Sequence, residues 1–351
     1  MMHPLQGWLR AGFLIPLFAF CSLFLSACQP APEAYRFNGL IMGTSYNVTV
    51  VDLPGGVTLA AVQKGVHAAL VSVDAEMSTY KPASGLMQLN GHPIDDARDI
   101  SAELMQVLQL SKEVYQASEG AFDPTVGALV NAWGFGPREV GADEVPSEAD
   151  IAQLQSAIGF DKLTLSPEQT TATRHGDVFV DLSAVAKGYG VDRAAEWLLA
   201  NGVDNFLVEV GGELRAHGYS PRGDRWVTAI SEPDSGVQPR IHRRLVIEGK
   251  AVATSGDYYN FFTVDGVRYS HTIDPRTGRP VTHGLASVTV VADTCAEADA
   301  FATAIDVLGP ERGLAMAERE GLAVYILARG EDGFVASYSP AFEQYIADAV
   351  R

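Results

Sequence analysis

An imidazole, a carboxylate and two guanidinium groups lie within ten residues of sequence, at positions 271–280. Two prolines and a glycine in this stretch exclude a regular helix or a central strand, so a loop is predicted, and loops carry many binding and catalytic side chains. His271 beside Asp274 is a usual arrangement for a general base. Arg276 and Arg279 are as well explained by turn capping or by exposure to water.

The element that must position His271 is a predicted β-hairpin. Strand-like runs at 261–264 and 267–269 flank Asp265 and Gly266, a pair that favours a two-residue turn between antiparallel strands. His271 is therefore expected at the end of one hairpin arm.

The strongest candidate metal ligands are Asp299 and Thr303. They stand four residues apart, so they share one face of a predicted helix near its N-terminus. A carboxylate and a hydroxyl suit Mg²⁺, which takes few protein oxygens and completes its octahedron with water and phosphate oxygens. The alternative is that Asp299 only interacts with the helix dipole while Thr303 packs.

A second candidate segment, residues 181–190, joins a predicted strand at 178–180 to a predicted helix at 191–200. Such a turn presents backbone groups to a ligand, and Lys187 would meet phosphate there. Arg193 stands where the third glycine of a dinucleotide-binding fingerprint belongs, and no P-loop pattern occurs. A Rossmann mode of binding is therefore not expected.

Two further segments carry weaker signals. A turn at residues 209–213 is more often a bulge than a site. Ser255 could be a hydrolase nucleophile with His271 as base and Asp274 or Asp257 as the orienting carboxylate. No Gly-x-Ser-x-Gly elbow supports that alternative.

The N-terminus reads as a targeting segment. Arg10 precedes an apolar run at 11–27 that suits a secretory signal and is short for a membrane span. The run ends in Leu-Ser-Ala followed by Cys28, which resembles the lipobox of bacterial lipoproteins, where cleavage precedes an acylated cysteine. Residues 1–27 are thus predicted to be a lipoprotein signal peptide, although an ordinary signal peptide is the alternative. The expected location is the periplasmic side of the inner or outer membrane.

Composition limits the partners. There are 43 acidic and 25 basic side chains, and a net charge of −18 repels nucleic acid, so a phosphate-bearing ligand needs a local positive group or a metal. Once residues 1–27 are removed and Cys28 is acylated, Cys295 is the one free thiol. We expect it to be a small buried core residue.

Strands and helices occur in clusters and do not alternate regularly, which predicts an α+β fold. After a tether at 28–36, residues 37–351 are expected to form a single large domain of two packed α/β halves. Helices are predicted at 59–77, 101–118, 148–158, 297–308 and 311–320, and strands within 37–51 and at 162–165, 206–210, 226–230, 244–247, 252–253, 288–291 and 322–327.

Taken in order, eight segments resemble the FAD:protein FMN transferase family, the ApbE-type flavin transferases, across most of residues 37–330. The segments are 42–44, 77–80, 121–124 with 133–136, 181–190, 209–213, 254–257, 271–280 and 298–303. The resemblance implies an ApbE-like, T-fold-like architecture. It also implies an enzyme that splits FAD at its pyrophosphate and joins FMN to a threonine or serine hydroxyl of a partner protein, with AMP leaving.

The resemblance assigns roles to individual residues. Mg²⁺ would be bound by the side chains of Asp299 and Thr303 and the carbonyl of Ala184, while Lys187 would contact the phosphates or nearby polar atoms of FAD. His271 matches the essential histidine of the family and would be the general base, or else carry a transient FMN adduct. The residues expected to line the FAD site are Met42, Tyr80, Ala121, Phe122, Asp123, Asp181 and Ile273.

Alternatives and partners also follow from the resemblance. Tyr80 resembles the transferring type of the family and differs from members that hydrolyse FAD, so a Mg²⁺-dependent FAD pyrophosphatase is the alternative enzyme. A non-catalytic flavin-binding lipoprotein is the alternative from another class. The implied acceptors are extracytoplasmic flavoprotein subunits of membrane electron-transfer systems, such as sodium-translocating NADH:quinone oxidoreductase, Rnf-type complexes or nitrous-oxide-reduction regulators.

Overall fold

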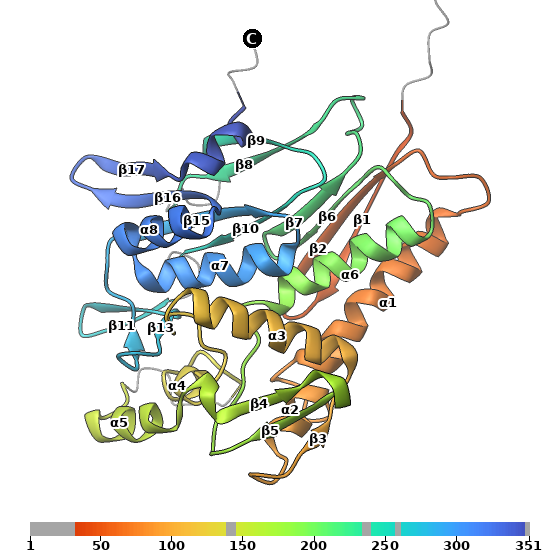
Figure 1. Ribbon diagram of the computed structural model, residues 1–351. Helices are drawn as coiled ribbons and strands as arrows, with labels where there is room; N and C mark the ends of the chain where they lie inside the picture. Colours follow the sequence, from red (N-terminus) through yellow and green to blue (C-terminus); the bar gives the residue numbers. More distant parts are fainter. Residues whose placement is uncertain (1–31, 138–144, 234–239, 257–260, 348–351) are drawn as a thin grey trace, which may run out of the picture. The chain divides into compact units, whose positions relative to one another are not determined.

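An eight-stranded sheet in which all neighbouring strands are antiparallel organises the fold (Figure 1). The computed structural model describes residues 32–137, 145–233, 240–256 and 261–347. The strand order is β1-β2-β6-β7-β10-β15-β16-β17. The bounds are β1 Ala34–Ile41, β2 Thr44–Val51, β6 Phe206–Val210, β7 Glu213–His217, β10 Ala251–Ser255, β15 Leu285–Ala292, β16 Ala323–Gly330 and β17 Gly333–Tyr338.

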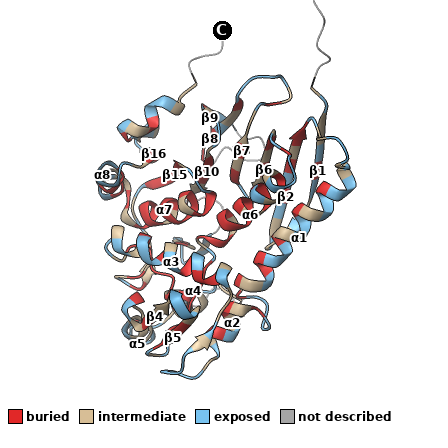
Figure 2. Cartoon of the chain, turned by 45° about the vertical axis from the view of Figure 1, so that its right-hand side comes forward, coloured by how far each residue is buried: buried red, intermediate tan, exposed pale blue. Residues whose placement is uncertain are grey.

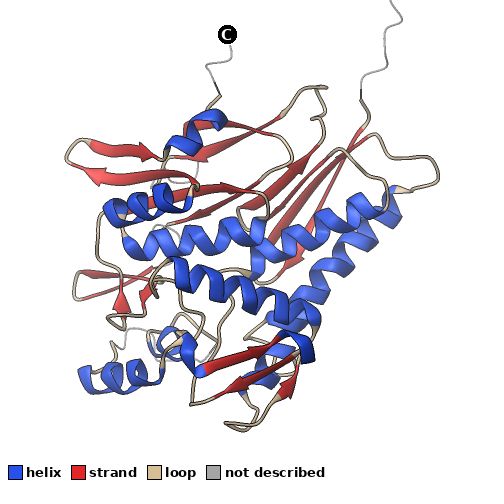
Figure 3. Cartoon of the chain, in the orientation of Figure 1, coloured by secondary structure: helices blue, strands red, loops and turns tan. Residues whose placement is uncertain are grey.

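Helices cover one face of this sheet, as Figure 3 shows. They are α1 Leu59–Met77, α6 Ala186–Ala200, α7 Cys295–Leu308 and α8 Pro310–Glu320, and α3 Ala102–Ala117 packs against α7. In α7, eleven of the residues from Cys295 to Val307 are buried, and the red colour of α6 and α7 in Figure 2 reflects this. Helices α6 and α7 lie at the centre of the core because both are long and largely apolar.

The opposite face of the sheet is covered by β8 Trp226–Ser231, β9 Ile241–Ile247 and the 3₁₀ helix η3 Pro340–Tyr345. A smaller three-stranded sheet has the order β3-β5-β4, with β3 Arg98–Asp99, β5 Thr171–Arg174 and β4 Leu163–Ser166. The remaining elements are α2 Gly85–Asn90, α4 Gly127–Ala132, α5 Glu148–Ala157, η1 Phe160–Lys162, η2 Pro167–Gln169, β11 Phe261–Val264, β12 Val267–Ser270, β13 Ile273–Asp274 and β14 Arg279–Pro280. The α+β prediction is confirmed, and the large antiparallel sheet is unlike the parallel sheet of a Rossmann fold.

The predicted hairpin before His271 is confirmed. Strands β11 and β12 pair in register, and Asp265 and Gly266 between them have φ of 49° and 79°. Both residues adopt the left-handed backbone conformation that a two-residue type I′ hairpin turn requires.

Two predicted boundaries differ from the structure. Helix α6 starts at Ala186, inside the segment predicted to be a loop, and residues 178–180 form only one isolated bridge, between Phe179 and Val126. Strand β1 starts at Ala34 because Ala34 already pairs with Val51, so the sheet includes the last residues of the predicted tether. The predicted signal peptide and the lipidation site Cys28 lie outside the described residues.

No helix in the described ranges combines the length and apolar character that a membrane span needs.

Candidate functional site

The N-terminal turn of α6 meets the first half of α7. Asp299 on α7 is 2% exposed, and its Oδ2 accepts a hydrogen bond from the backbone N–H of Gly188 at 3.0 Å. Lys187 Nζ stands 3.8 Å from the same oxygen. Asp299 and Lys187, predicted from separate segments, are therefore neighbours.

The carbonyl of Ala184 is left available by this contact. In a regular helix the N–H of Gly188 would donate to the carbonyl four residues earlier, which belongs to Ala184. That N–H donates to Asp299 instead, and no backbone N–H within the described residues donates to the Ala184 oxygen. Thr303 lies one turn beyond Asp299 on α7, with its Oγ1 3.5 Å from Ser255 Oγ.

These oxygens fit the donor set of Mg²⁺. The start of α6 and the first half of α7 offer a carboxylate, a carbonyl and a hydroxyl, and Mg²⁺ accepts such hard donors while keeping positions for water and phosphate. Within the described residues there is no cluster of three or more His, Cys, Asp or Glu side chains that could hold a metal ion. A cation here would therefore complete its coordination with water or with substrate oxygens.

Glu213, which opens β7, completes a buried charge cluster with Lys187. Its Oε1 is 3.5 Å from Lys187 Nζ, and the residue is 4% exposed. Burial raises the pKa of Glu213, and the Lys187 charge acts in the opposite direction. Burial alone would lower the pKa of Lys187, but Asp299 and Glu213 raise it well above its usual value. The lysine is thus held as a cation.

Asp123, Asp181 and Tyr80 are linked through neighbouring contacts. The N–H of Asp181 donates to the carbonyl of Pro124 at 2.7 Å, which joins the segment before α6 to the residue after Asp123. Asp123 is buried, and burial raises its pKa to about 6, although hydrogen bonds from Thr125 act in the opposite direction. Tyr80 is 65% exposed, and partial desolvation together with the charge of Asp181 raises its pKa.

Three of the predicted lining residues have buried side chains. Ala121 and Phe122 are 1% and 3% exposed, and Ile273 is 5% exposed and packs with Trp133. Met42 occupies the β1–β2 turn at φ 53°, beside Gly190 of α6.

His271 follows β12 and is half-buried, with its ring edge-on to Phe135 at 6.3 Å between centroids. Asp274, one of the two carboxylates considered for orienting His271, pairs with Arg276. Each carboxylate oxygen of Asp274 is 2.8 Å from a nitrogen of Arg276, so the guanidinium group binds this carboxylate in a bidentate manner. Arg276 is accordingly an ion-pair partner within the loop and not a solvent-facing side chain.

Two long-range contacts fix the loop that carries His271. Trp133 Nε1 donates to the carbonyl of Gly278 at 2.9 Å, and Thr272 Oγ1 donates to Asp306 Oδ2 at 2.8 Å. Asp306 is on α7, the helix that also carries Asp299 and Thr303. One helix therefore connects the imidazole segment with the oxygen donors.

The hydrolase alternative loses support. Ser255 Oγ faces Thr303 Oγ1, and Asp274 is committed to Arg276. Asp257, the other proposed orienting carboxylate, lies outside the described residues. The buried position of Cys295 is confirmed, since its side chain is 0% exposed and its Sγ lies 3.6 Å from the carbonyl of Leu214.

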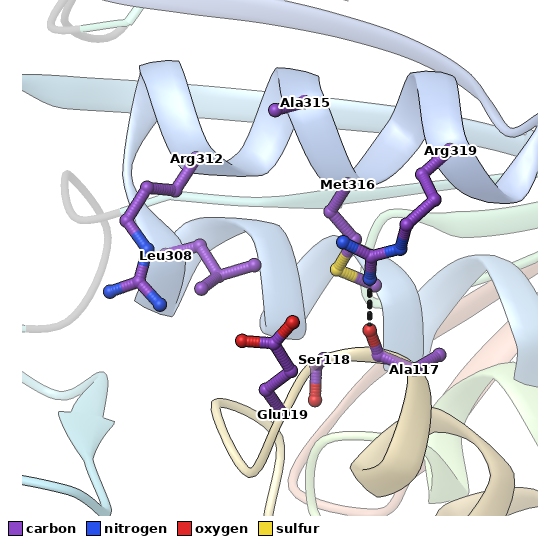
Figure 4. Close-up of a pocket in the computed structure, with 8 residues that line it drawn as sticks. All are labelled: Ala117, Ser118, Glu119, Leu308, Arg312, Ala315, Met316 and Arg319. Carbon is purple, nitrogen blue, oxygen red and sulfur yellow. Dashed lines mark hydrogen bonds between the residues drawn. The ribbon is translucent and has the colours of Figure 1, made fainter.

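A separate shallow cavity of about 180 Å³ lies between α8 and the end of α3 (Figure 4). Arg312 and Arg319 reach it from α8, and Arg319 donates to the carbonyl of Ala117 at 2.5 Å. Glu119, which faces Arg312 across the cavity in Figure 4, lies shortly before Ala121 in sequence. None of the predicted site residues lines this cavity.

Sequence reasoning missed two residues of the cluster. The sequence favours a bulge around Glu213, and the signal that could identify it is an acidic residue at the start of a strand directly after two glycines. Asp192 on α6 accepts hydrogen bonds from the N–H groups of Cys295 and Ala296, both at 2.9 Å, and pairs with Arg215 at 2.7 Å. It fixes the start of α7, and an acidic residue inside an apolar helix was its signal.

Comparison with known proteins gives consistent matches along the chain. A family model described as the ApbE family matches residues 42–326. An FAD:protein FMN transferase of Vibrio cholerae is 38% identical over 326 residues, covering 93% of this chain and 96% of the relative. One of Haemophilus influenzae is 39% identical over 329 residues, covering 92% and 94%.

Solved structures agree. The flavin transferase ApbE from Vibrio cholerae has a TM-score of 0.83 at 36% identity and covers 90% of this chain and 99% of its own. The apo form of the flavinyl transferase ApbE of Pseudomonas stutzeri also has a TM-score of 0.83 at 36% identity, with coverage of 91% and 98%.

Proposed function

The chain belongs to the ApbE family, whose curated relatives are FAD:protein FMN transferases, and we propose that it transfers the FMN part of FAD to a threonine or serine hydroxyl of an acceptor protein, releasing AMP with the aid of Mg²⁺. The observation that carries the metal assignment is the α6–α7 junction. There Asp299 takes the N–H of Gly188, and among the residues that the structure describes no backbone N–H donates to the Ala184 carbonyl.

Phosphoryl transfer depends mainly on positioning and on neutralising charge. When bound, Mg²⁺ would neutralise the pyrophosphate and withdraw charge from the bond that breaks. Lys187, kept cationic by its carboxylate neighbours, is placed to hold phosphate oxygens beside the metal ligands. In a chain of net charge −18, this local positive group is what allows an anionic substrate to approach.

His271 is proposed as the general base that takes the proton from the acceptor hydroxyl as its oxygen attacks phosphorus. Its loop is anchored to α4 by Trp133 and to α7 by Thr272, so the imidazole is held relative to Asp299 and Thr303. An imidazole held in a fixed position is suited to that proton transfer. The flavin site is proposed to be lined by Met42, Tyr80, Ala121, Phe122, Asp123, Asp181 and Ile273.

The location of the enzyme is part of the proposal. We place it on the periplasmic side of a membrane, anchored by lipid at Cys28, with flavoprotein subunits of membrane electron-transfer complexes as acceptors. The support is the lipobox-like sequence before Cys28. Replacement Cys28→Ser should abolish acylation, which the mass of the mature chain would reveal.

The transferase is tested with the full chain, FAD, Mg²⁺ and a flavoprotein domain that carries an acceptor threonine. We expect the intact mass of the acceptor to rise by one FMN, with AMP released in equal amount, and we expect both products to be lost with EDTA or in His271→Ala. His67→Ala, which removes an exposed imidazole from α1, should leave the reaction unchanged.

Other outcomes distinguish the alternatives. AMP released without any gain in acceptor mass would make the protein an FAD pyrophosphatase. Intact FAD recovered after long incubation would leave a non-catalytic flavin-binding protein and refute the transferase.

A further inference from the structure

Three charged side chains from three different elements meet in the interior. Lys187 of α6 lies between Glu213 of β7, at 3.5 Å, and Asp299 of α7, at 3.8 Å. Glu213 and Asp299 are 4% and 2% exposed. The two distances are similar, so the ammonium is shared between the two carboxylates.

Glu213 differs from Asp299 in what else it contacts. Asp299 also accepts the N–H of Gly188, but Glu213 Oε2 is buried and has no hydrogen-bond partner within the described part of the chain. A buried carboxylate oxygen without a partner is costly, so Glu213 depends on its ion pair with Lys187.

The stem of Lys187 is held on the same side as Glu213. A Cβ at Gly211, in the turn that leads into β7, would stand 3.4 Å from Lys187 Cδ, so the lysine stem packs over this turn. Glu209 Oε1 fixes the turn by accepting the N–H of Gly212 at 2.7 Å. The lysine therefore reaches Asp299 only with its terminal amine, which is the flexible end of the side chain.

We infer that Glu213 is a positioning residue, the counter-ion that keeps the Lys187 ammonium from occupying the place of the metal at Asp299. This inference rests on the proposed function, in which Asp299 binds Mg²⁺. With the cation bound to Asp299, Lys187 pairs with Glu213 alone. Without Glu213, Asp299 is the one carboxylate among the described residues that lies beside the ammonium of Lys187. A metal ion would then have to displace the ammonium from Asp299.

Binding of Mg²⁺ alone, measured by calorimetry on the full chain, tests this inference without turnover. In Glu213→Gln we expect the dissociation constant for Mg²⁺ to rise about tenfold, the usual scale for loss of a group that orients a metal ligand. Glu213→Asp keeps the charge and should stay within about threefold of the unchanged protein, well inside that scale. Glu196→Gln removes the same charge from the exposed surface of α6 and should have no effect.

The decisive variant is Glu213→Gln combined with Lys187→Met. Removing the competing ammonium should restore Mg²⁺ affinity to within about threefold of the unchanged protein, because no cation then covers Asp299. A loss caused only by altered packing would not be repaired in this way. Circular dichroism of each variant confirms that the fold is retained. If Glu213→Gln does not fold, Lys187→Met alone carries the test: Mg²⁺ affinity should not fall, because the competing ammonium is gone, and an affinity about tenfold weaker would contradict the inference.

Three results would overturn the inference. Unchanged Mg²⁺ affinity in Glu213→Gln would show that Lys187 does not compete for Asp299. A double variant as weak as Glu213→Gln would show that Glu213 acts by packing or as a metal ligand itself, and not by competing with Asp299 for Lys187. If the unchanged protein does not bind Mg²⁺, the metal assignment in the proposed function fails and this inference fails with it, whereas the first two results leave that assignment standing.

Discussion

The backbone N–H of Gly188 donates to the carboxylate of Asp299 across the interface of α6 and α7. A side chain at position 188 cannot fit beside this bond. A Cβ there would stand 2.6 Å from the carbonyl carbon of Cys295 and 2.8 Å from Asp299 Cβ. The glycine is therefore required by the approach of the two helices and not by its own backbone angles.

Gly188→Ala should lower the free energy of unfolding by about 1–3 kcal/mol, because the helices must separate to admit the methyl group. Mg²⁺ affinity should fall as well, since Asp299 moves. Gly190→Ala is the matched control, because its Cβ would meet Met42 Sδ at 3.3 Å, the end of a flexible side chain. Equal stability of the two variants in urea unfolding would contradict this account.

Asp192→Ala should destabilise the protein by about 3 kcal/mol, because it removes the acceptor for two N–H groups of α7 and leaves Arg215 without its carboxylate. Urea unfolding measures the loss. Glu196→Ala removes an exposed ion pair with Arg193 from the same helix and should cost less than about 1 kcal/mol. A small effect at Asp192 would mean that α7 does not need this cap.

Trp133→Phe should slow flavin transfer about tenfold while lowering stability by only about 1 kcal/mol, since it removes the hydrogen bond to the His271 loop but keeps an aromatic ring. Trp226→Phe removes a similar bond, from Nε1 to the carbonyl of His217 at 3.0 Å, on the other face of the sheet. It should match the stability loss and leave the rate unchanged. Equal rates in both variants would show that the loop is held without Trp133.

Asp123→Asn should change the pH dependence of stability. Burial raises the pKa of Asp123 from 3.8 to about 6, so the folded protein binds this proton more tightly than the unfolded chain. The stabilisation from this proton is fully present below the pKa of Asp123 in the unfolded chain. It is lost as pH rises through the pKa of Asp123 in the folded protein. From pH 8 to pH 5, urea unfolding should show the unchanged protein gaining about 1 kcal/mol relative to the variant.

An exposed carboxylate provides the control for this pH effect. Asp332 lies in the turn between β16 and β17 and is exposed. Asp332→Asn should keep the pH profile of the unchanged protein, and a profile of Asp123→Asn that matches it would contradict a raised pKa at Asp123.

Local patterns predicted the elements that depend on local sequence. The hairpin before His271 followed from Asp265 and Gly266, and α7 from its apolar periodicity. The start of α6 was predicted too late because Gly188 is a turn signal in isolation. It is tolerated in the helix because α7, more than a hundred residues away in sequence, requires a residue without a side chain there.

The sequence identified several residues of the candidate site by their types, but it did not identify which of them contact one another. Asp299 and Lys187 were singled out from separate motifs, but their proximity, and the third charge at Glu213, depend on which strands are neighbours in the sheet. Asp274 illustrates the opposite case. Sequence places it near both His271 and Arg276, and only the side-chain geometry decides that the guanidinium takes both oxygens.

The pairing of β2 with β6 has a consequence for how the protein is made. Asn47 of β2 bonds Glu209 of β6 across 162 residues of chain. At a synthesis rate of roughly 5–20 residues per second, the β1–β2 hairpin waits on the order of ten to thirty seconds for its neighbour. During that interval the edge of β2 has open backbone groups, so early folding of the chain depends on keeping this hairpin from pairing with another copy.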